Sequence, residues 1–129
     1  MNKCGDENKD WYIRKIKDTL ASSWHIPPVH CVDYNSGPFG DMKAIAEDTC
    51  RFISQKMDSE EWKLKDGVVL IGLSQGGLIA RYIVEGCYNV SPHVLKLLTI
   101  GTPNNGISQL PNQVPNPMRS LLGKLNIKI

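Results

Sequence analysis

The sequence predicts a single α/β domain built on a parallel sheet. Segments with apolar residues at helical spacing alternate with short continuous apolar runs, which is the order of elements in α/β folds. The run at 68–71 is apolar on both faces, which predicts a central parallel strand with helices on both sides. The run at 94–100 predicts a second buried strand. A length of 129 residues fits one domain.

Each element has a local signal. The first helix carries apolar residues at helical spacing up to Leu20 and ends before Pro27. Asp41 is a typical N-cap for the second helix. In chain order, the predicted elements are a helix over 10–23, a strand over 29–32, a loop over 35–40, a helix from 42 to about 57, a strand over 68–71, a helix from within 74–77 to about 87, and a strand over 94–100.

Composition excludes several classes of protein. Apolar residues make up 41% and charged residues 22%, which is ordinary for a globular domain and unlike a disordered chain. Fifteen Lys and Arg against thirteen Asp and Glu give a net charge of +2, too balanced for a nucleic-acid binder. No apolar run is long enough to span a bilayer, and the charged start predicts no signal peptide.

The cysteines allow more than one interpretation. Cys4, Cys31, Cys50 and Cys87 are widely spaced, with no zinc-type cluster of Cys and His. They are either buried reduced thiols or members of disulfides, and three pairings are open to four cysteines. We expect no metal site.

Residues 72–76 read Gly-Leu-Ser-Gln-Gly, a G-x-S-x-G motif between a predicted strand and a predicted helix. This is the setting of a nucleophile elbow, in which the serine lies on a tight, strained turn. We expect side chains in place of Gly72 and Gly76 to collide with neighbouring backbone. The backbone N–H of Gln75 is placed to donate to an oxyanion beside Ser74. The alternative is a glycine-rich turn without catalysis, such as a phosphate-binding turn.

A base for this serine is harder to find. After Ser74 the chain has no Asp, one Glu and one His. Glu85 is predicted to pair with Arg81 at i,i+4, and His93 precedes a strand, at the edge of the sheet opposite Ser74. The usual triad order of Ser, then acid, then His also disfavours the earlier histidines, His25 and His30.

The sheet of such an enzyme is incomplete as well. Only three strands are predicted, and the chain has no His-Gly pair of the kind that opens an oxyanion-hole loop. We therefore expect an internal fragment of a larger hydrolase. We also expect poor solubility or association of the isolated chain, because a sheet without its neighbours exposes apolar edges.

The region from Val69 to Gly106 resembles the palmitoyl-protein thioesterases, lysosomal α/β-hydrolases that cleave fatty acyl thioesters from cysteine. The residues that carry the resemblance are Gly-Leu-Ser-Gln-Gly-Gly at 72–77, Arg81, Ile100-Gly101, Asn104-Asn105-Gly106-Ile107 and Leu110-Pro111. With the layout upstream, it extends over about 29–111. It implies a three-layer α/β-hydrolase sheet, of which residues 1–129 are one partial domain, with a core segment over 1–111 and an insertion or tail over 112–129.

The resemblance also implies roles for single residues. Ser74 matches the nucleophile, Gln75 the oxyanion-hole donor, and Gly72, Gly76 and Gly77 the elbow glycines. Cys50 and Cys87 match a disulfide pair.

The family's acid and base have no counterpart here, so we expect this chain to be inactive alone. The implied substrates are S-acylated proteins or peptides, with no cofactor or metal, in the lysosome or secretory pathway. A sequon at Asn89-Val90-Ser91, followed by Pro92, agrees with that route.

Two other functions remain open. The chain could belong to a serine lipase or esterase that acts on oxygen esters. It could also belong to a non-catalytic paralogue that binds acyl chains without turnover.

Overall fold

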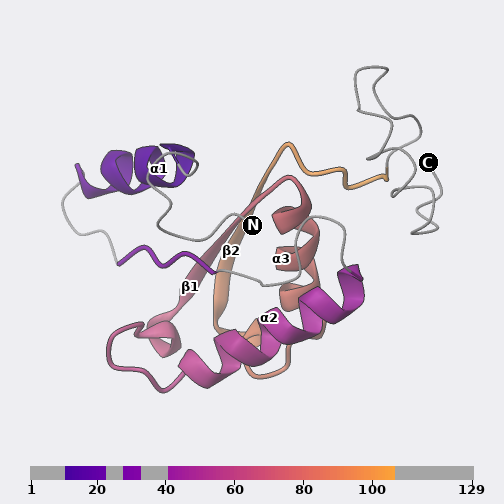
Figure 1. Ribbon diagram of the computed structural model, residues 1–129. Helices are drawn as coiled ribbons and strands as arrows, with labels where there is room; N and C mark the ends of the chain where they lie inside the picture. Colours follow the sequence, from indigo (N-terminus) through magenta and orange to yellow (C-terminus); the bar gives the residue numbers. More distant parts are fainter. Residues whose placement is uncertain (1–10, 23–27, 33–40, 107–129) are drawn as a thin grey trace.

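The computed structural model describes residues 11–22, 28–32 and 41–106, which form a small α/β unit (Figure 1). The predicted helices and the last two strands are present close to their expected bounds. The elements are α1 (Trp11–Ala21), α2 (Met42–Lys56), the 3-10 turn η1 (Leu64–Asp66), β1 (Val68–Leu73), α3 (Gln75–Gly86), the 3-10 turn η2 (Ser91–His93) and β2 (Val94–Ile100).

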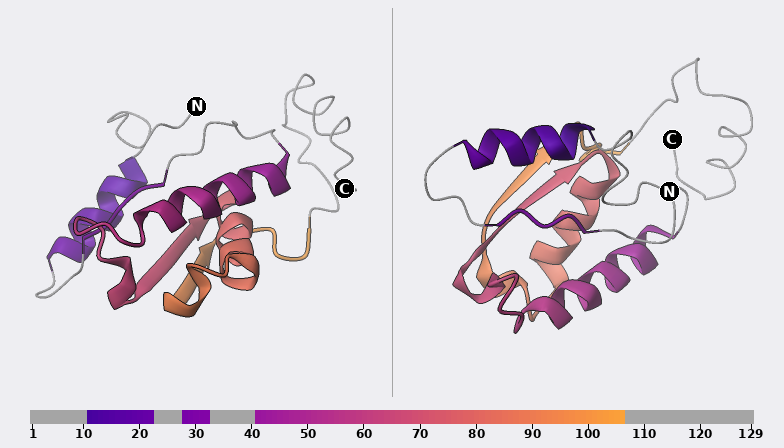
Figure 2. Two further views of the ribbon diagram at one scale, coloured as in Figure 1. Left: turned by 90° about the horizontal axis from the view of Figure 1, so that it is seen from below. Right: turned by 60° about the vertical axis from the view of Figure 1, so that its left-hand side comes forward.

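The sheet consists of β1 and β2, which are parallel neighbours joined by α3. Val68 pairs with Val94 at one edge and Leu73 with Ile100 at the other, with an irregularity after Val68. Helix α3 packs against both strands and α2 packs against α3, so both helices lie on the same side of the sheet (Figures 1 and 2).

Helix α2 begins where the sequence predicts. The Asp41 carboxylate accepts hydrogen bonds from the backbone N–H groups of Lys43, at 2.9 Å, and Ala44, at 3.4 Å. This cap satisfies donors that the first turn of a helix leaves without intrahelical acceptors. The buried side of α2 consists of Ile45, Ala46, Thr49 and Ile53.

The buried core has two parts. The larger cluster joins the end of α2 to the end of α3 and consists of Ile53, Met57, Leu64, Ile83, Cys87 and Val90. The smaller cluster lies between the beginnings of these helices and consists of Ile45, Ala46 and Ile79. Cys50 and Cys87 form a disulfide that ties α2 to the end of α3, with 5.7 Å between their Cα atoms.

The predicted strand at 29–32 is not a strand in the structure. Within the described residues the sheet has two strands, where the sequence predicted three. Val32 packs against the larger core cluster, and the His30 ring stacks on Trp62 with 4.2 Å between ring centroids. The Val32 side chain therefore packs against the core, while the backbone of residues 28–32 pairs with neither strand.

The prediction that the strand at 68–71 is buried on both faces is also wrong for the described residues, and the predicted strand at 94–100 is likewise exposed on one face. Val68, Leu70 and Val94 pack into the core on the side of α3. The opposite face carries Val69, Ile71, Leu98 and Ile100, which we call the open face, with exposed fractions of 46%, 38%, 47% and 51%. Among the α1 side chains that the structure describes, none is fully buried, and Ile16 and Leu20 are half-buried.

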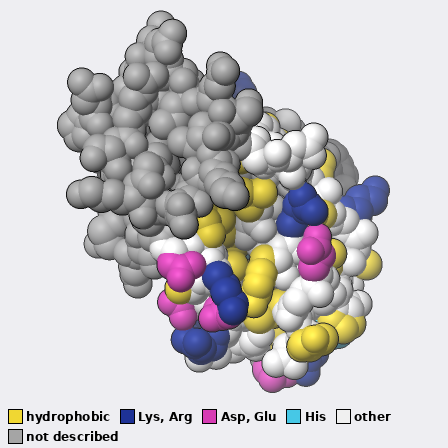
Figure 3. Space-filling view, turned by 90° about the vertical axis from the view of Figure 1, so that its right-hand side faces the viewer, with side chains coloured by type: hydrophobic (Ala, Val, Ile, Leu, Met, Phe, Trp, Pro, Cys, Tyr) yellow, Lys and Arg dark blue, Asp and Glu magenta, His cyan; other side chains and the backbone are white. Residues whose placement is uncertain are grey.

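Charges are mixed over the part of the surface seen in Figure 3, where Lys and Arg lie beside Asp and Glu. This agrees with the small net charge of +2. In the described part of the chain, no helix is long and apolar enough to cross a membrane.

Candidate active site

Ser74 connects β1 to α3, and its backbone has an unusual conformation. Its φ is 50° and its ψ is −120°, and the only other described non-glycine residue with positive φ is Lys63. Such a conformation costs on the order of 1–3 kcal/mol and persists only where the surroundings hold it. Here the Ser74 N–H donates to the carbonyl of Ile100 at 2.8 Å, and the Ser74 carbonyl accepts from Gly77 N–H at 3.1 Å.

The Ser74 side chain faces outward from this turn. The residue is exposed, and its hydroxyl makes no capping hydrogen bond to α3. The serine oxygen therefore lies at the carboxyl edge of the sheet, in front of the N-terminus of a helix of 12 residues. The N-terminal end of a helix favours negative charge.

Two glycines allow the backbone on either side of Ser74 to pack closely against neighbouring atoms. A Cβ on Gly72 would lie 2.6 Å from the carbonyl oxygen of Gly76 and would also overlap the backbone of Gly77. A Cβ on Gly77 would lie 2.7 Å from both Cβ and Cγ2 of Thr102 and closer still to its hydroxyl. Thr102 belongs to the segment that follows β2, so Gly77 lets that segment pass directly beside the turn.

Gly76 does not have the role that the sequence predicted for it. A Cβ at this position would meet nothing within 4 Å. The expected collision with neighbouring backbone is correct for Gly72 and wrong for Gly76, because Gly77 is the residue of α3 that approaches Gly72 and Thr102. The Gly-Gly pair at 76–77 is the feature of the sequence that could have indicated that the second glycine is the closely packed one.

Gln75 is the first residue of α3, directly after Ser74. Its side-chain amide donates to the sulfur of Met42 at 2.7 Å, which links the start of α3 to the start of α2. Backbone N–H groups in the first turn of a helix have no intrahelical acceptor, so an anion at this position meets donors and a favourable dipole.

Asp41 also lies at this end of α2, beside Met42, and sequence reasoning did not consider it for the site. Its carboxylate is engaged as the cap of α2, as described above. Asp41 therefore has a structural role as the cap of α2, and it makes no contact with Ser74 in the structure.

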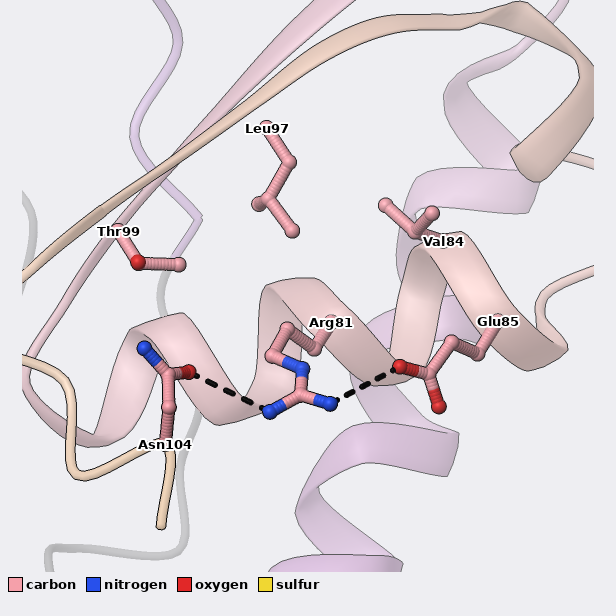
Figure 4. Close-up of a pocket in the computed structure, with 6 residues that line it drawn as sticks. All are labelled: Arg81, Val84, Glu85, Leu97, Thr99 and Asn104. Atoms are coloured by element: carbon pink, nitrogen blue, oxygen red, sulfur yellow. Dashed lines mark hydrogen bonds and ion pairs between the residues drawn. The ribbon is translucent and has the colours of Figure 1, made fainter.

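Glu85 pairs with Arg81, as the sequence predicts. The Arg81 guanidinium lies 3.3 Å from the Glu85 carboxylate and donates to the side-chain carbonyl of Asn104 at 3.4 Å (Figure 4). Arg81 thus joins α3 to the segment after β2, which also contacts Gly77. Glu85 is exposed and sits near the far end of α3 from Ser74.

Neither described histidine lies beside Ser74. His93 immediately precedes β2 and approaches the carbonyl oxygen of Lys65 at 3.3 Å. His93 is therefore at the opposite edge of the sheet from Ser74. The length of β2 separates the two residues by about 20 Å, at the usual rise per residue of a strand. His30 stacks on Trp62, before β1, and its Nε2 is buried with no hydrogen-bond partner. His25 lies outside the described residues.

A shallow pocket of about 290 Å³ lies between α3 and β2, and Ser74 does not line it. Its lining residues are Arg81, Val84, Glu85, Leu97, Thr99 and Asn104 (Figure 4). Among residues 11–22, 28–32 and 41–106, no three His, Cys, Asp or Glu side chains are grouped so that they could hold a metal ion.

Comparison with known proteins gives the chain a family. The sequence model described as Palmitoyl protein thioesterase matches residues 2–127. A curated relative from Schizosaccharomyces pombe, palmitoyl-protein thioesterase-dolichyl pyrophosphate phosphatase fusion 1, is 30% identical over 83 residues. This match covers 64% of the chain and 12% of the relative, and no solved structure matches the chain. Because the family match covers nearly the whole sequence, the chain belongs to the palmitoyl protein thioesterase family.

Proposed function

We propose that this chain carries the nucleophile of a serine hydrolase that cleaves long-chain fatty acyl thioesters, such as palmitoyl thioesters, from protein cysteines. The observation that carries the proposal is the backbone of Ser74, held at φ 50° between β1 and α3 in a chain of this family. A strained serine on a strand-to-helix turn is the geometry that a nucleophile elbow requires.

In this proposal the Ser74 hydroxyl gives its proton to a general base while its oxygen bonds to the thioester carbonyl carbon, and the oxygen of that carbonyl becomes negatively charged. The backbone N–H of Gln75, at the N-terminal end of α3, donates to that oxygen. The cysteine sulfur then leaves with the electron pair and takes up a proton, and water hydrolyses the acyl-serine. The exposure of Ser74 supports this role, because a protein-bound thioester must reach it.

The general base belongs to residues outside the described ranges in this proposal. His30 and His93 both lie away from Ser74, and Glu85 is paired with Arg81. After Ser74 the 129 residues contain one histidine, His93, so the usual triad order leaves no base for Ser74. We therefore propose that the isolated 129-residue chain does not turn over thioesters.

We further propose that the protein acts in the secretory pathway or lysosome on S-acylated proteins or peptides. The Cys50–Cys87 disulfide supports an oxidising compartment, because structural disulfides persist there and are rare in the cytosol. The thioesterase name of the yeast relative supports the substrate class.

The test compares hydrolysis of a palmitoyl thioester and a matched oxygen ester by the protein expressed from its full gene. Ser74→Ala should remove thioester hydrolysis. Ser59→Ala is the matched control, because Ser59 lies in the turn after α2 and its side chain makes no hydrogen bond in the described part of the structure.

Hydrolysis that survives Ser74→Ala would refute the nucleophile. A preference for the oxygen ester would replace the substrate class with that of a lipase or esterase. Binding of the acyl chain without any turnover would favour a non-catalytic paralogue.

A further inference from the structure

The segment after β2, residues 101–104, runs directly beside the turn that carries Ser74. The carbonyl of Ile100, the last residue of β2, accepts a hydrogen bond from the Ser74 N–H at 2.8 Å, and the Thr102 side chain lies against Gly77. We propose that Thr102 is a positioning residue for acyl transfer, because its side chain fixes the first turn of α3 and through it the Ser74 oxygen. This inference rests on the function proposed above, in which Ser74 is the nucleophile.

Thr102 occupies the space that a side chain on Gly77 would need. A Cβ on Gly77 would lie 2.7 Å from both Cβ and Cγ2 of Thr102, so the Thr102 side chain is in direct contact with the backbone of α3. Gly77 is buried, and the Thr102 hydroxyl oxygen is buried without a hydrogen-bond partner in the described part of the chain. Thr102 therefore acts on this turn through its shape and volume, since its hydroxyl forms no bond there.

Gly77 connects this contact to Ser74. Its N–H donates to the Ser74 carbonyl at 3.1 Å, and a Cβ on Gly72 would overlap its Cα, so Gly77 packs against Gly72 as well as against Thr102. The positive φ of Ser74, 50°, persists only where neighbouring residues hold the backbone. Removal of the Thr102 side chain takes away one of the contacts that hold Gly77, and the Ser74 backbone gains room to relax.

Thr102 is itself held on both sides along the chain. Before it, Ile100 pairs with Leu73 of β1. After it, the Asn104 N–H donates to the Thr102 carbonyl at 2.8 Å, and the Asn104 side chain accepts from Arg81 of α3 at 3.4 Å (Figure 4). Because the segment is tied to the sheet before Thr102 and to α3 after it, the Thr102 side chain is a fixed contact for the first turn of α3.

The consequence for the reaction is a loss of orientation rather than of substrate binding. The Thr102 hydroxyl is buried, so Thr102 does not touch the reacting atoms. It sets the direction of the Ser74 oxygen and of the Gln75 N–H, which both extend from the turn that it holds. A displacement of a reacting group by about 1 Å costs about 100-fold in rate. Loss of the Thr102 side chain should therefore lower kcat and leave KM unchanged.

The experiment measures palmitoyl thioester hydrolysis by the protein expressed from its full gene, below the melting transition of each variant. Thr102→Ala removes the methyl and the hydroxyl and should lower kcat by about tenfold or more at an unchanged KM. Thr102→Val keeps the volume and removes only a hydroxyl that has no partner, so its kcat should stay within about threefold of the wild type.

Thr49→Ala is the control for a general loss of stability. Thr49 is buried in α2, and its hydroxyl donates to the carbonyl of Ile45 at 2.7 Å. Its replacement removes a buried hydrogen bond without changing the turn at Ser74, so it should lower the melting temperature and leave kcat unchanged.

Three results would overturn the inference and leave the proposed function intact. They are a wild-type kcat in folded Thr102→Ala, an equal loss of kcat in Thr49→Ala, and an equal loss in Thr102→Val. Hydrolysis that survives Ser74→Ala would instead overturn the proposed function and this inference with it. If Thr102→Ala does not fold, Thr102→Ser decides, since it loses only the methyl group: a lower kcat at an unchanged KM supports the inference, and a wild-type kcat overturns it.

Discussion

Gly76 and Gly77 are adjacent in the first turn of α3, and their surroundings differ. The space beside Gly76 is open, whereas a methyl group on Gly77 would overlap the side chain of Thr102. Periodicity and the G-x-S-x-G motif predicted where the turn lies. They could not predict which glycine is packed, because Thr102 comes from a segment 25 residues further along the chain.

Gly77→Ala is therefore expected to lower the free energy of unfolding by about 1–3 kcal/mol, through overpacking against Thr102. Gly76→Ala is the matched control and is expected to raise it by about 0.5–1 kcal/mol, since alanine suits a helix and meets no neighbour. Urea unfolding of the two variants measures both effects. Equal losses of stability in the two variants would contradict the packing described here.

Glu85 provides a second test at the scale of a residue. Its carboxylate contacts Arg81 at 3.3 Å, and two-thirds of its side-chain surface, 67%, is exposed. Glu85→Gln should lower stability by less than about 1 kcal/mol, as for other exposed ion pairs. It should also leave thioester hydrolysis by the protein from its full gene unchanged. A loss of the maximal rate with normal folding would instead make Glu85 the missing acid.

At the scale of elements, helices α2 and α3 and strand β2 lie close to where their local signals predict. Each is defined by its own periodicity and by a local cap or turn, such as the Asp41 carboxylate at the start of α2. The segment at 29–32 has the β-branched composition of a strand, but a strand also needs a partner, and pairing is not local. Val32 and His30 find side-chain contacts there instead.

The Cys50–Cys87 bond connects two elements that the chain separates by 37 residues. Replacing both cysteines with alanine is expected to cost about 4 kcal/mol of stability, because the unfolded chain regains the entropy of that loop. The double variant is preferable to a reductant, because Cys31 is disulfide-bonded as well and a reductant would also break that bond. Denaturant unfolding gives the difference, and a change below about 1 kcal/mol would show that the bond does not constrain the unfolded chain.

At the scale of the whole molecule, the open face is the main departure from the predicted fold. The apolar pattern of β1 correctly predicts a strand at this position. The side chains of that strand are apolar on both faces. Burial itself depends on what packs against the strand, and among the described residues only the α3 side is covered. Val69, Ile71, Leu98 and Ile100 form an apolar surface of the kind that promotes association.

We expect the 129-residue chain to sediment as dimers or larger species at micromolar concentration. Leu98→Lys should shift it toward the monomer, because the charge opposes burial of the open face. Tyr88→Lys is the control, since Tyr88 is exposed at the α3–η2 turn and lies outside that face. A monomeric wild-type chain with a cooperative melting transition would contradict this expectation.

The most direct test of the central proposal is to trap the acyl-enzyme. The protein expressed from its full gene is mixed with a palmitoyl thioester and quenched in acid, and its peptides are mapped by mass spectrometry. We expect a palmitoyl group on the oxygen of Ser74 that is absent from Ser74→Ala and present in Ser59→Ala. A palmitoyl group on another residue, or turnover by Ser74→Ala at the wild-type rate, would contradict it.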